Sequence, residues 1–299
     1  MTNADSTGDP SAASSSPDLE GLDRAEIGDS MECEERCLSR LRQLLAGDES
    51  LDCPTDDKFL IKFLRARKYR EEEAFKTIQK YFRVRKSSEE YFTDFSPATV
   101  PLSTVIADNR LMMVSKQKDP EGRTVGLLRI GLWNTGICPL LDLARTALIM
   151  AEWTLLDEET QIRGIVCVLD LRDLHIMHLA HFTPLFIKKA AHIVQDCYPV
   201  RIKAIYVINN PPAFEILFAA VKPFLKSKIL QRISFIGHDL SKLHGLVPAD
   251  VIPAEYGGSL EDFDYRGMQK EVESKNAYFE YINQFGYHSK ELDCEYTKL

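Results

Sequence analysis

The fold is decided by two runs in the middle of the chain, GIVCVLDL (164–171) and KAIYVIN (203–209). Both runs are almost continuously apolar, which is typical of strands buried on both faces of a parallel sheet. Between them lies a predicted helix at 182–196, begun by Thr183 and Pro184. A strand, a helix and a second strand in this order predict a mainly parallel sheet covered by helices.

The same alternation extends outward in both directions. Before the first run, LMMVS and TVGLLRI flank the turn DPEGR, and this pattern predicts a hairpin. The further predicted elements are strands at 111–115, 124–130 and 232–237, and helices at 139–157, 212–222 and 264–285.

Residues 31–91 show helical periodicity only, with Thr55 as the predicted N-cap of a helix that carries Phe59 and Phe63. Before them, the Ser-, Asp- and Gly-rich start has too few apolar residues to order itself. We therefore expect an α/β protein in four segments: a disordered acidic tail (1–30), a small all-helical subdomain (31–93), the sheet domain (94–262), and a C-terminal helix with a tail (263–299).

Charge is unevenly distributed along the 299 residues. The formal net charge is −8, and residues 1–50 account for all of it, so the body of the chain is neutral and local basic patches on it can attract anions. No apolar run approaches the roughly 20 residues that a membrane-spanning helix needs, and the N-terminus does not resemble a secretory signal. The seven cysteines show no metal-like clustering, which favours reduced thiols in the cytoplasm.

Motifs for covalent chemistry are missing. The sequence contains no GxGxxG, GxxxxGK[ST] or GxSxG motif. His175, His178 and His181 could share a helix face and bind a metal, but no carboxylate or cysteine ligand accompanies them. Asp157, Glu158 and Glu159 are better explained as a solvated helix end. We expect no enzyme activity, no cofactor, no metal and no nucleic-acid partner.

Binding is indicated instead by residues 212–232. Phe214, Leu217, Phe218 and Val221 form one apolar stripe on a helix. Beyond it the basic residues Lys222, Lys226, Lys228 and Arg232 follow without an acid between them. An apolar stripe beside a basic cluster suits a segment that meets a membrane surface. Taken alone, the segment is better explained as a core helix that has a solvated end.

Two further basic stretches are weaker signals. Strand alternation turns Arg201 and Lys203 to one side and Ile202 to the other, which would separate an anion-binding surface from an interior. Residues 62–70 (KFLRARKYR) hold five bases and no acid. Because Arg65 and Arg67 stand two positions apart on a helix, they diverge, so not all of these bases can serve one site.

These segments, in this order, resemble the CRAL-TRIO family of lipid-transfer proteins, in particular its tocopherol-transfer, retinaldehyde-binding and clavesin-like branch. The resemblance covers roughly residues 31–285. Its motifs are FLIKFLRARKY (59–69), EETQIRGIVCVLDL (158–171), VQDCYPVRIKAIYVIN (194–209), KPFLKSKILQRI (222–233) and VIPAEYGG (251–258).

The resemblance implies that one face of the sheet, roofed by helices, encloses an apolar cavity with a movable lid. By matched position the cavity lining comprises Leu128, Ala144, Ala147, Leu148, Ala151, Ile165, Cys167, Leu169, Leu174, Ile176, Phe182, Ile193, Val194 and Ile202. The lid residues are Phe214, Leu217, Phe218, Val221 and Leu225. The implied phosphatidylinositol phosphate site comprises Arg67, Arg201, Lys203, Lys228 and Arg232.

The chain departs from the tocopherol-transfer pattern inside the pocket. Leu132 stands before Trp133 where that relative has histidine, and Ala147 and Ala151 replace serines. Lost hydroxyls remove partners for the polar end of a ligand, and an unpaired buried polar group costs about 1–3 kcal/mol. Tocopherol itself is therefore in doubt as the ligand, whereas a large apolar molecule is not.

We therefore expect a cytoplasmic carrier of one hydrophobic small molecule or lipid, which associates transiently and peripherally with endosomal or other phosphoinositide-bearing membranes. The alternatives are a phosphatidylinositol or phosphatidylcholine exchanger, or a small-GTPase or membrane-trafficking interaction module. A hydrolase would need a nucleophile–base pair, which no motif supplies.

Overall fold

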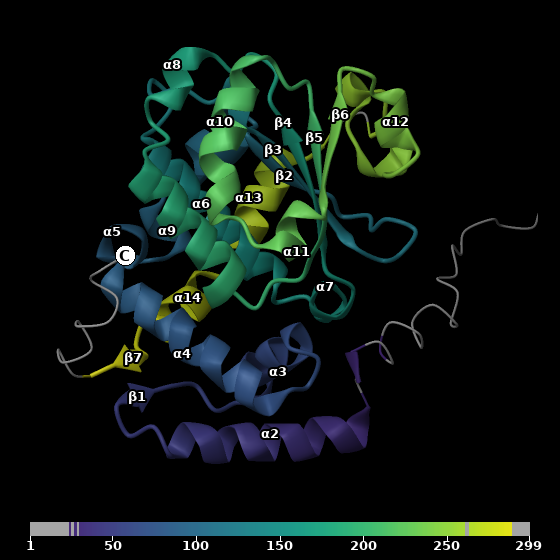
Figure 1. The fold of residues 1–299 in the computed structure, drawn as a ribbon. Coiled ribbons are helices and arrows are strands. Elements are labelled where there is room, and N and C mark those ends of the chain that lie inside the picture. Colours follow the sequence, from purple (N-terminus) through teal and green to yellow (C-terminus); the bar gives the residue numbers. More distant parts are fainter. Residues whose placement is uncertain (1–23, 25–26, 29, 261–262, 289–299) are drawn as a thin grey trace, which may run out of the picture.

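The computed structural model describes residues 24, 27–28, 30–260 and 263–288. The expected tail therefore lies almost wholly outside the described residues, as do the last residues of the C-terminal segment. Of the first four helices that follow residue 30, three lie together below the sheet in Figure 1 and the fourth, α5, lies higher, at its side. These helices are α2 (Met31–Ala46), α3 (Asp57–Ala66), α4 (Glu71–Ser87) and the single turn α5 (Glu89–Phe92). No helix in the described part of the chain combines the length and apolarity needed to cross a bilayer.

A five-stranded sheet forms the centre of the rest of the chain, in the order β2-β3-β4-β5-β6. Its strands are β2 (Met112–Val114), β3 (Thr124–Arg129), β4 (Ile165–Asp170), β5 (Ile202–Ile208) and β6 (Ile233–Gly237). The β2–β3 pair is antiparallel and the other three pairs are parallel, because helices carry the chain back between successive strands. The predicted mainly parallel α/β sheet, preceded by helices, is confirmed.

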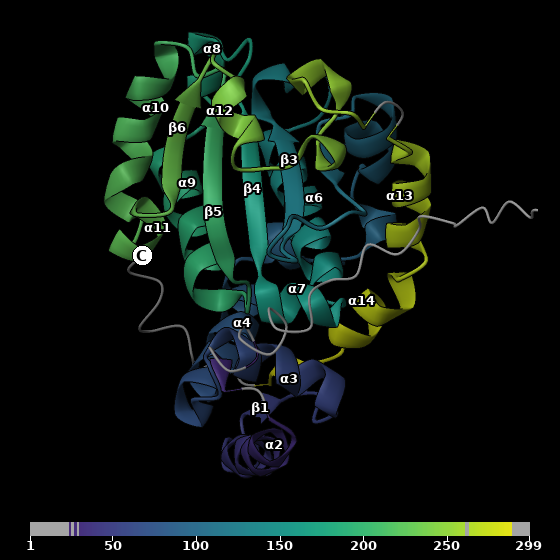
Figure 2. The same cartoon turned by 90° about the vertical axis from the view of Figure 1, so that its right-hand side faces the viewer.

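Helices cover one face of this sheet, and the segment that contains one short helix crosses the other, as Figures 1 and 2 show. On one side lie α6 (Leu140–Thr154), α9 (Pro184–His192) and α10 (Ala213–Val221), and we call this side of the sheet the α10 face. On the other side lies α12 (Ser241–His244). The remaining helices include α7 (Glu158–Arg163), α8 (Ile176–Leu179), α11 (Ser227–Leu230), α13 (Tyr265–Glu273) and α14 (Asn276–Ile282).

Three predictions about helix limits were wrong in detail. Asp56, not Thr55, is the N-cap of α3, and its side chain accepts a hydrogen bond from the backbone N–H of Phe59. The helix predicted at 182–196 ends at His192 and continues as a π-helical turn, Ile193–Cys197. The last predicted helix, 264–285, is divided into α13 and α14.

An irregularity in strand pairing decides which residues of β5 face α10. Ile165 pairs with Ile202, whereas Val166 pairs with Ala204, so Lys203 is an extra residue on β5. Such a bulge reverses the alternation of side chains along the rest of the strand. Ile205 and Val207 consequently share a face with Cys167 and Leu169, their partners on β4.

A buried ion pair joins the N-terminal helices to the sheet domain. Lys62 of α3 donates to Glu152 of α6 at 2.6 Å, and both side chains are 2% exposed or less. The Tyr278 hydroxyl of α14 bonds both partners, and Tyr81 of α4 donates to the second oxygen of Glu152. Burial alone would raise the pKa of Glu152, but the charge of Lys62 and these hydrogen bonds hold that pKa below its usual value.

We predict that replacing Lys62 by methionine lowers the free energy of unfolding by about 3–5 kcal/mol, because Glu152 is left buried and unpaired. Urea unfolding measures the change. Lys76→Met is the control, since Lys76 and Glu73 form an exposed pair expected to contribute at most about 1 kcal/mol. The double variant Lys62→Met/Glu152→Leu should be more stable than Lys62→Met, and an equal loss for Lys62→Met and Lys76→Met would contradict the argument.

Candidate functional site

Side chains on the α10 face are less tightly packed than those on the opposite face. Val166 and Val168 of β4 are 0% and 1% exposed, whereas Cys167 and Leu169, which point the other way, retain accessible surface. Burial nevertheless raises the pKa of the Cys167 thiol to about 11. The central strand β4 thus has deeply placed apolar side chains that the surrounding atoms do not cover completely.

The apolar residues beneath α10 form a cluster of their own. Leu217 of α10 packs with Leu171, Leu174 and Val207, and these four residues are not part of the main hydrophobic core. Of the predicted lid residues, only Leu217 is buried, and Phe214, Phe218, Val221 and Leu225 are half-buried. The rings of Phe214 and Phe218 also contact Phe235 of the edge strand β6, with centroids 5.7 and 5.1 Å away.

The predicted cavity residues divide into three groups by burial. Those that are half-buried are Leu128, Ala144, Ala147, Ala151, Cys167, Leu169, Phe182 and Ile202. Those that are buried are Leu148, Ile165, Leu174 and Ile193. Ile176 and Val194 are 64% and 36% exposed, so neither is part of the packed interior, and their place in the cavity lining stays a prediction. Ile176 lies in the one-turn helix α8, and Val194 lies in the π-helical turn.

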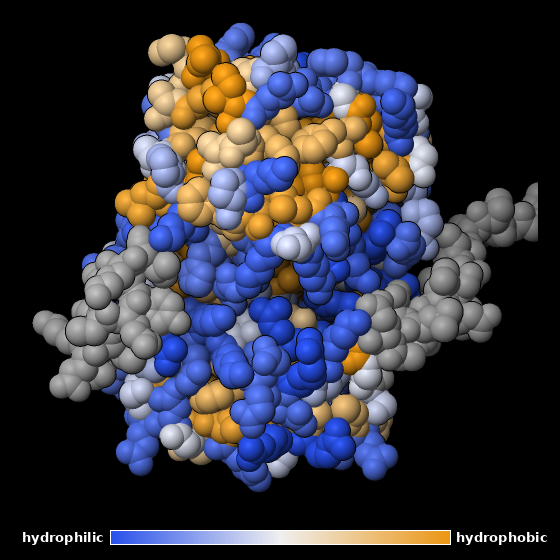
Figure 3. All heavy atoms as spheres, in the orientation of Figure 1, coloured by the Kyte–Doolittle hydropathy of each residue, from blue (hydrophilic) through white to orange (hydrophobic). Residues whose placement is uncertain are grey.

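An apolar patch lies on the surface around α10. It comprises Ile176, Met177, Leu185, Ile216 and Phe235, each at least half exposed. Figure 3 shows that hydrophobic residues gather over the half of the molecule where α8 and α10 lie, above a hydrophilic band. Contiguous exposed apolar patches often mark surfaces that bind a protein or a membrane.

The chain after α10 is fixed by two residues of the π-helical turn, which we call the hinge clamp. Gln195 donates to the carbonyl of Phe224 at 3.0 Å and accepts from the N–H of Lys226 at 2.7 Å. Asp196 pairs with the Lys226 ammonium. The hydrogen bond from His192, together with Lys226 and against the effect of burial, holds the pKa of Asp196 well below its usual range.

Basic residues from three parts of the chain meet beside this clamp. Burial lowers the pKa of Lys228, and the positive charges of Arg232, Lys68, Arg67 and Arg201 lower it further. We call these five residues the basic cluster. It contains four of the five predicted headgroup residues, and it adds Lys68, which sequence reasoning passed over although the run 62–70 contains it.

Backbone contacts orient several of these cations. The guanidinium groups of Arg201 and Arg232 donate to the carbonyls of Ile162 and Ile202. Arg67 donates to the Thr77 hydroxyl at 2.7 Å. Burial lowers the pKa of Arg67, and the nearby Asp196 carboxylate opposes that shift.

The predicted divergence of the bases in 62–70 is confirmed for Arg65 and Arg67. Arg65 is 5% exposed and donates to Gln161 and Glu158 of α7, at 2.8 and 2.9 Å. It therefore fastens α3 to the sheet domain, whereas Arg67 belongs to the basic cluster.

Gly164 allows the strand that carries Arg201 to come close. Its φ is +88°, and a Cβ there would lie 2.3 Å from the carbonyl oxygen of Arg201 and 3.0 Å from Cγ of Lys203. Any other residue at this position would push β5 away and move both cations. Lys203, the fifth predicted headgroup residue, thus lies beside Arg201 at the bulge.

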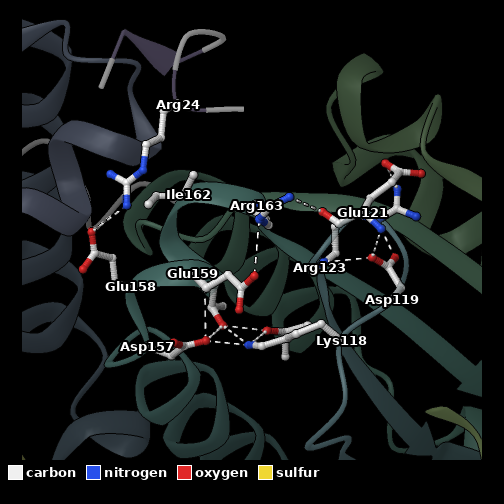
Figure 4. Close-up of polar contacts among 12 residues, drawn as sticks. Arg24, Lys118, Asp119, Glu121, Arg123, Asp157, Glu158, Glu159, Ile162 and Arg163 are labelled. Atoms are coloured by element: carbon white, nitrogen blue, oxygen red, sulfur yellow. Dashed lines mark hydrogen bonds and ion pairs between the residues drawn. The ribbon is translucent and has the colours of Figure 1, made fainter. Parts of the chain in front are cut away.

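The contacts drawn in Figure 4 hold α7, which supplies the Ile162 carbonyl. Asp157 caps the helix by accepting from Thr160, and Lys118 of the β2–β3 loop donates to Asp157. At the other end, Arg163 donates to the Glu121 carbonyl at 3.1 Å. The acidic run that begins at Asp157 thus has a structural role here.

Comparisons with known proteins agree with this architecture. A CRAL/TRIO domain model matches residues 108–258. Over 248 residues the chain is 35% identical to human "Alpha-tocopherol transfer protein-like" (Homo sapiens), covering 83% of this chain and 72% of that protein. It is 28% identical over 250 residues to "Clavesin-1" of Rattus norvegicus, covering 83% and 70%. The crystal structure of Sfh5 is similar in fold, with a TM-score of 0.51 at 16% identity, covering 81% of this chain and 97% of that one.

We predict that Gln195→Ala accelerates amide hydrogen exchange across residues 222–230 about tenfold, because two hydrogen bonds at the hinge are lost at roughly 0.5–1.5 kcal/mol each. Mass spectrometry of exchanged peptides measures this. Gln231→Ala, at an exposed glutamine just after α11, is the matched control. Equal exchange in the two variants would show that Gln195 does not hold the hinge.

Proposed function

The chain belongs to the CRAL/TRIO family, and from that premise we propose that it is a carrier that encloses one hydrophobic ligand and exchanges it at membranes. The observation that carries the proposal is the accessible surface of Cys167 and Leu169 on the α10 face. Because β4 is the central strand, these side chains project from the middle of the α10 face, and we propose that the space against them lies beneath the covering helices. Protein interiors are otherwise close-packed, so such space suits a ligand.

The helix α6 contributes room for that ligand. Ala144, Ala147, Leu148 and Ala151 fall at helical spacing on one face of α6, and the three alanines are half-buried. An aliphatic ligand placed there would lose water contact worth about 25 cal/mol per Å². The name of the relative in Homo sapiens supports a tocopherol-like molecule, but the alanines at 147 and 151 offer no hydroxyl to its polar end.

We propose that α10 is the lid. Opening it in water would expose Leu217 and the half-buried Phe214 and Phe218, which is unfavourable. At a membrane these side chains, together with the apolar patch, would enter the interface instead, so opening costs less there. Release would therefore be coupled to membrane contact.

The basic cluster is the proposed phosphatidylinositol phosphate site. Burial lowers the pKa of Lys228, and the four other cations of the cluster lower it further, so together the five create a local positive field that an anionic headgroup would relieve. Guanidinium groups bind phosphate oxygens through charge-assisted hydrogen bonds. Headgroup binding would select the target membrane, endosomal or another that bears phosphoinositides, and would favour the open lid there.

Other functions rest on less. A phosphatidylinositol or phosphatidylcholine exchanger would use the same interior with a different ligand. A small-GTPase or trafficking interaction module would not need accessible space beside Cys167. We propose no catalytic activity. Beside the hinge clamp the Cys197 thiol lies 3.5 Å from Nε2 of His192, but burial raises the pKa of that thiol to about 12, which keeps it protonated at neutral pH.

We predict that Ala147→Phe reduces occupancy of the interior by at least fivefold, because overfilling a packed space costs about 1–3 kcal/mol. The protein is incubated with mixed lipid vesicles and then examined by native mass spectrometry with lipid extraction. Ala219→Phe, on an exposed position of α10, is the control. Wild-type protein should carry one apolar molecule, and protein that stays empty would favour the interaction module.

We predict that Lys228→Glu weakens binding to vesicles that contain phosphatidylinositol bisphosphate by about tenfold, since one basic residue at a membrane contributes about 1 kcal/mol and reversal removes more. Vesicle co-sedimentation measures this. Lys242→Glu, an exposed lysine of α12 on the other side of the sheet, makes the same change in net charge. If both variants lose the same amount of vesicle binding, the loss reflects the change in net charge and not a site at Lys228.

A further inference from the structure

A groove runs between the N-terminal helices and α9, and none of the predicted headgroup residues lines it. It offers about 850 Å³ between α4 and α5 on one wall and α9 with the π-helical turn on the other. Its cationic lining residues are Lys80, Arg83, Lys86, Lys188 and Lys189, with His192 beside them. We call it the α4–α9 groove.

The acidic side chains of the groove are largely neutralised already. Glu90 pairs with Lys189. Asp196 pairs with Lys226, a lysine that does not line the groove, and lies 3.9 Å from Lys80. Of the three lining acids only Glu89 remains, and it is exposed. The groove therefore keeps an excess of positive charge.

Two of the cations have no carboxylate partner among the described residues. Arg83 places its guanidinium 5.2 Å from the centre of the Tyr287 ring, and its buried Nε finds no hydrogen-bond acceptor in that part of the chain. Lys188 is half-buried in the groove wall. Partly desolvated cations without a counter-charge attract an anion more strongly than exposed ones do.

The position of the groove relates it to the membrane. Leu185 belongs both to the apolar patch and to the groove lining, and Phe224 at the base of the proposed lid also lines it. With the apolar patch on a bilayer, Leu185 would bring this part of the groove to the membrane surface. The hinge clamp separates it from the basic cluster, because Gln195 and Asp196 form part of its wall.

We propose that the α4–α9 groove is a second anion site that binds a phosphate-bearing group, distinct from the basic cluster. The inference rests on the proposed membrane function for the source of that group, which would be an acidic phospholipid of the same bilayer. Lys188 and Arg83 bind the phosphate, and Leu185 and Phe224 contact the adjoining glycerol and acyl region. Each of the two sites would then contribute separately to docking, one on either side of the hinge.

The test uses the full chain, with Lys188→Glu as the variant and Lys242→Glu as the control of equal charge change. Binding is measured on phosphatidylcholine vesicles with phosphatidylserine, and on phosphatidylcholine vesicles with phosphatidylinositol bisphosphate. We expect Lys188→Glu to weaken binding to the phosphatidylserine vesicles about five- to tenfold and to leave the phosphoinositide vesicles near the control. Lys228→Glu should do the reverse.

Inorganic phosphate, titrated at constant ionic strength and followed by amide chemical shifts around residue 188, distinguishes a free phosphate from a lipid. One possible outcome is that Lys188→Glu abolishes the binding of inorganic phosphate but leaves binding to phosphatidylserine vesicles unchanged. That result would support the anion site and overturn the lipid as the source of its phosphate. If Lys188→Glu and Lys242→Glu behave alike in all arms, the second site is overturned. If wild-type protein binds neither kind of vesicle, the proposed membrane function fails, and the phosphate titration alone then decides whether the groove binds an anion.

Urea unfolding reports whether the charge reversal disturbs folding. If it does, Lys188→Ala replaces Lys188→Glu in the same measurements.

Discussion

The buried pair of Lys62 and Glu152 is the constraint on which the arrangement of the molecule depends. It joins α3, α6 and, through Tyr278, α14, at a place from which water is excluded. Buried charges are costly unless their geometry is satisfied, so these helices have few alternative placements. Because Arg67 follows α3 directly, its position beside the cations of β5 and α11 is set by the same contact.

The sheet separates a tightly packed side from a loosely packed one. Val166 and Val168 lie on the tightly packed side, and the bulge at Lys203 turns the half-buried Ile205 toward the other side. The bulge also leaves Arg201 and Lys203 at the start of β5, next to Gly164. The bulge at Lys203 therefore lies between the two cations at the start of β5 and the apolar residues that follow them on the same strand.

Much of this could be predicted from residue patterns, and some could not. Continuous apolar runs identify β4 and β5, and the stripe at Phe214 and Leu217 identifies α10, because burial imposes these periods locally. A bulge leaves no mark in the composition of a strand. Alternation could therefore predict the directions of Arg201, Ile202 and Lys203, but it could not predict which residues of β5 face α10 after Lys203. The exposure of Ile176 and the hydrogen bonds of Gln195 depend on where distant segments meet. Arg65 and Arg67 were separable because helix geometry alone makes them diverge.

The carboxylate of Asp196 has an electrostatic role between the two groups of cations. It pairs with Lys226 and supports the charged form of Arg67, while the like charges of the basic cluster lower the pKa of Lys228. When no anion is bound to the basic cluster, the Asp196 carboxylate limits the repulsion among its cations. Together with Gln195, Asp196 also holds Phe224 and Lys226 in the segment after α10. A phosphate bound to the cluster would take over the neutralising role, so the attraction of Lys226 to Asp196 would then compete with a stronger counter-ion. In the proposed function, the charges that attract a headgroup would therefore also weaken the contact between Asp196 and Lys226 in the segment that follows α10.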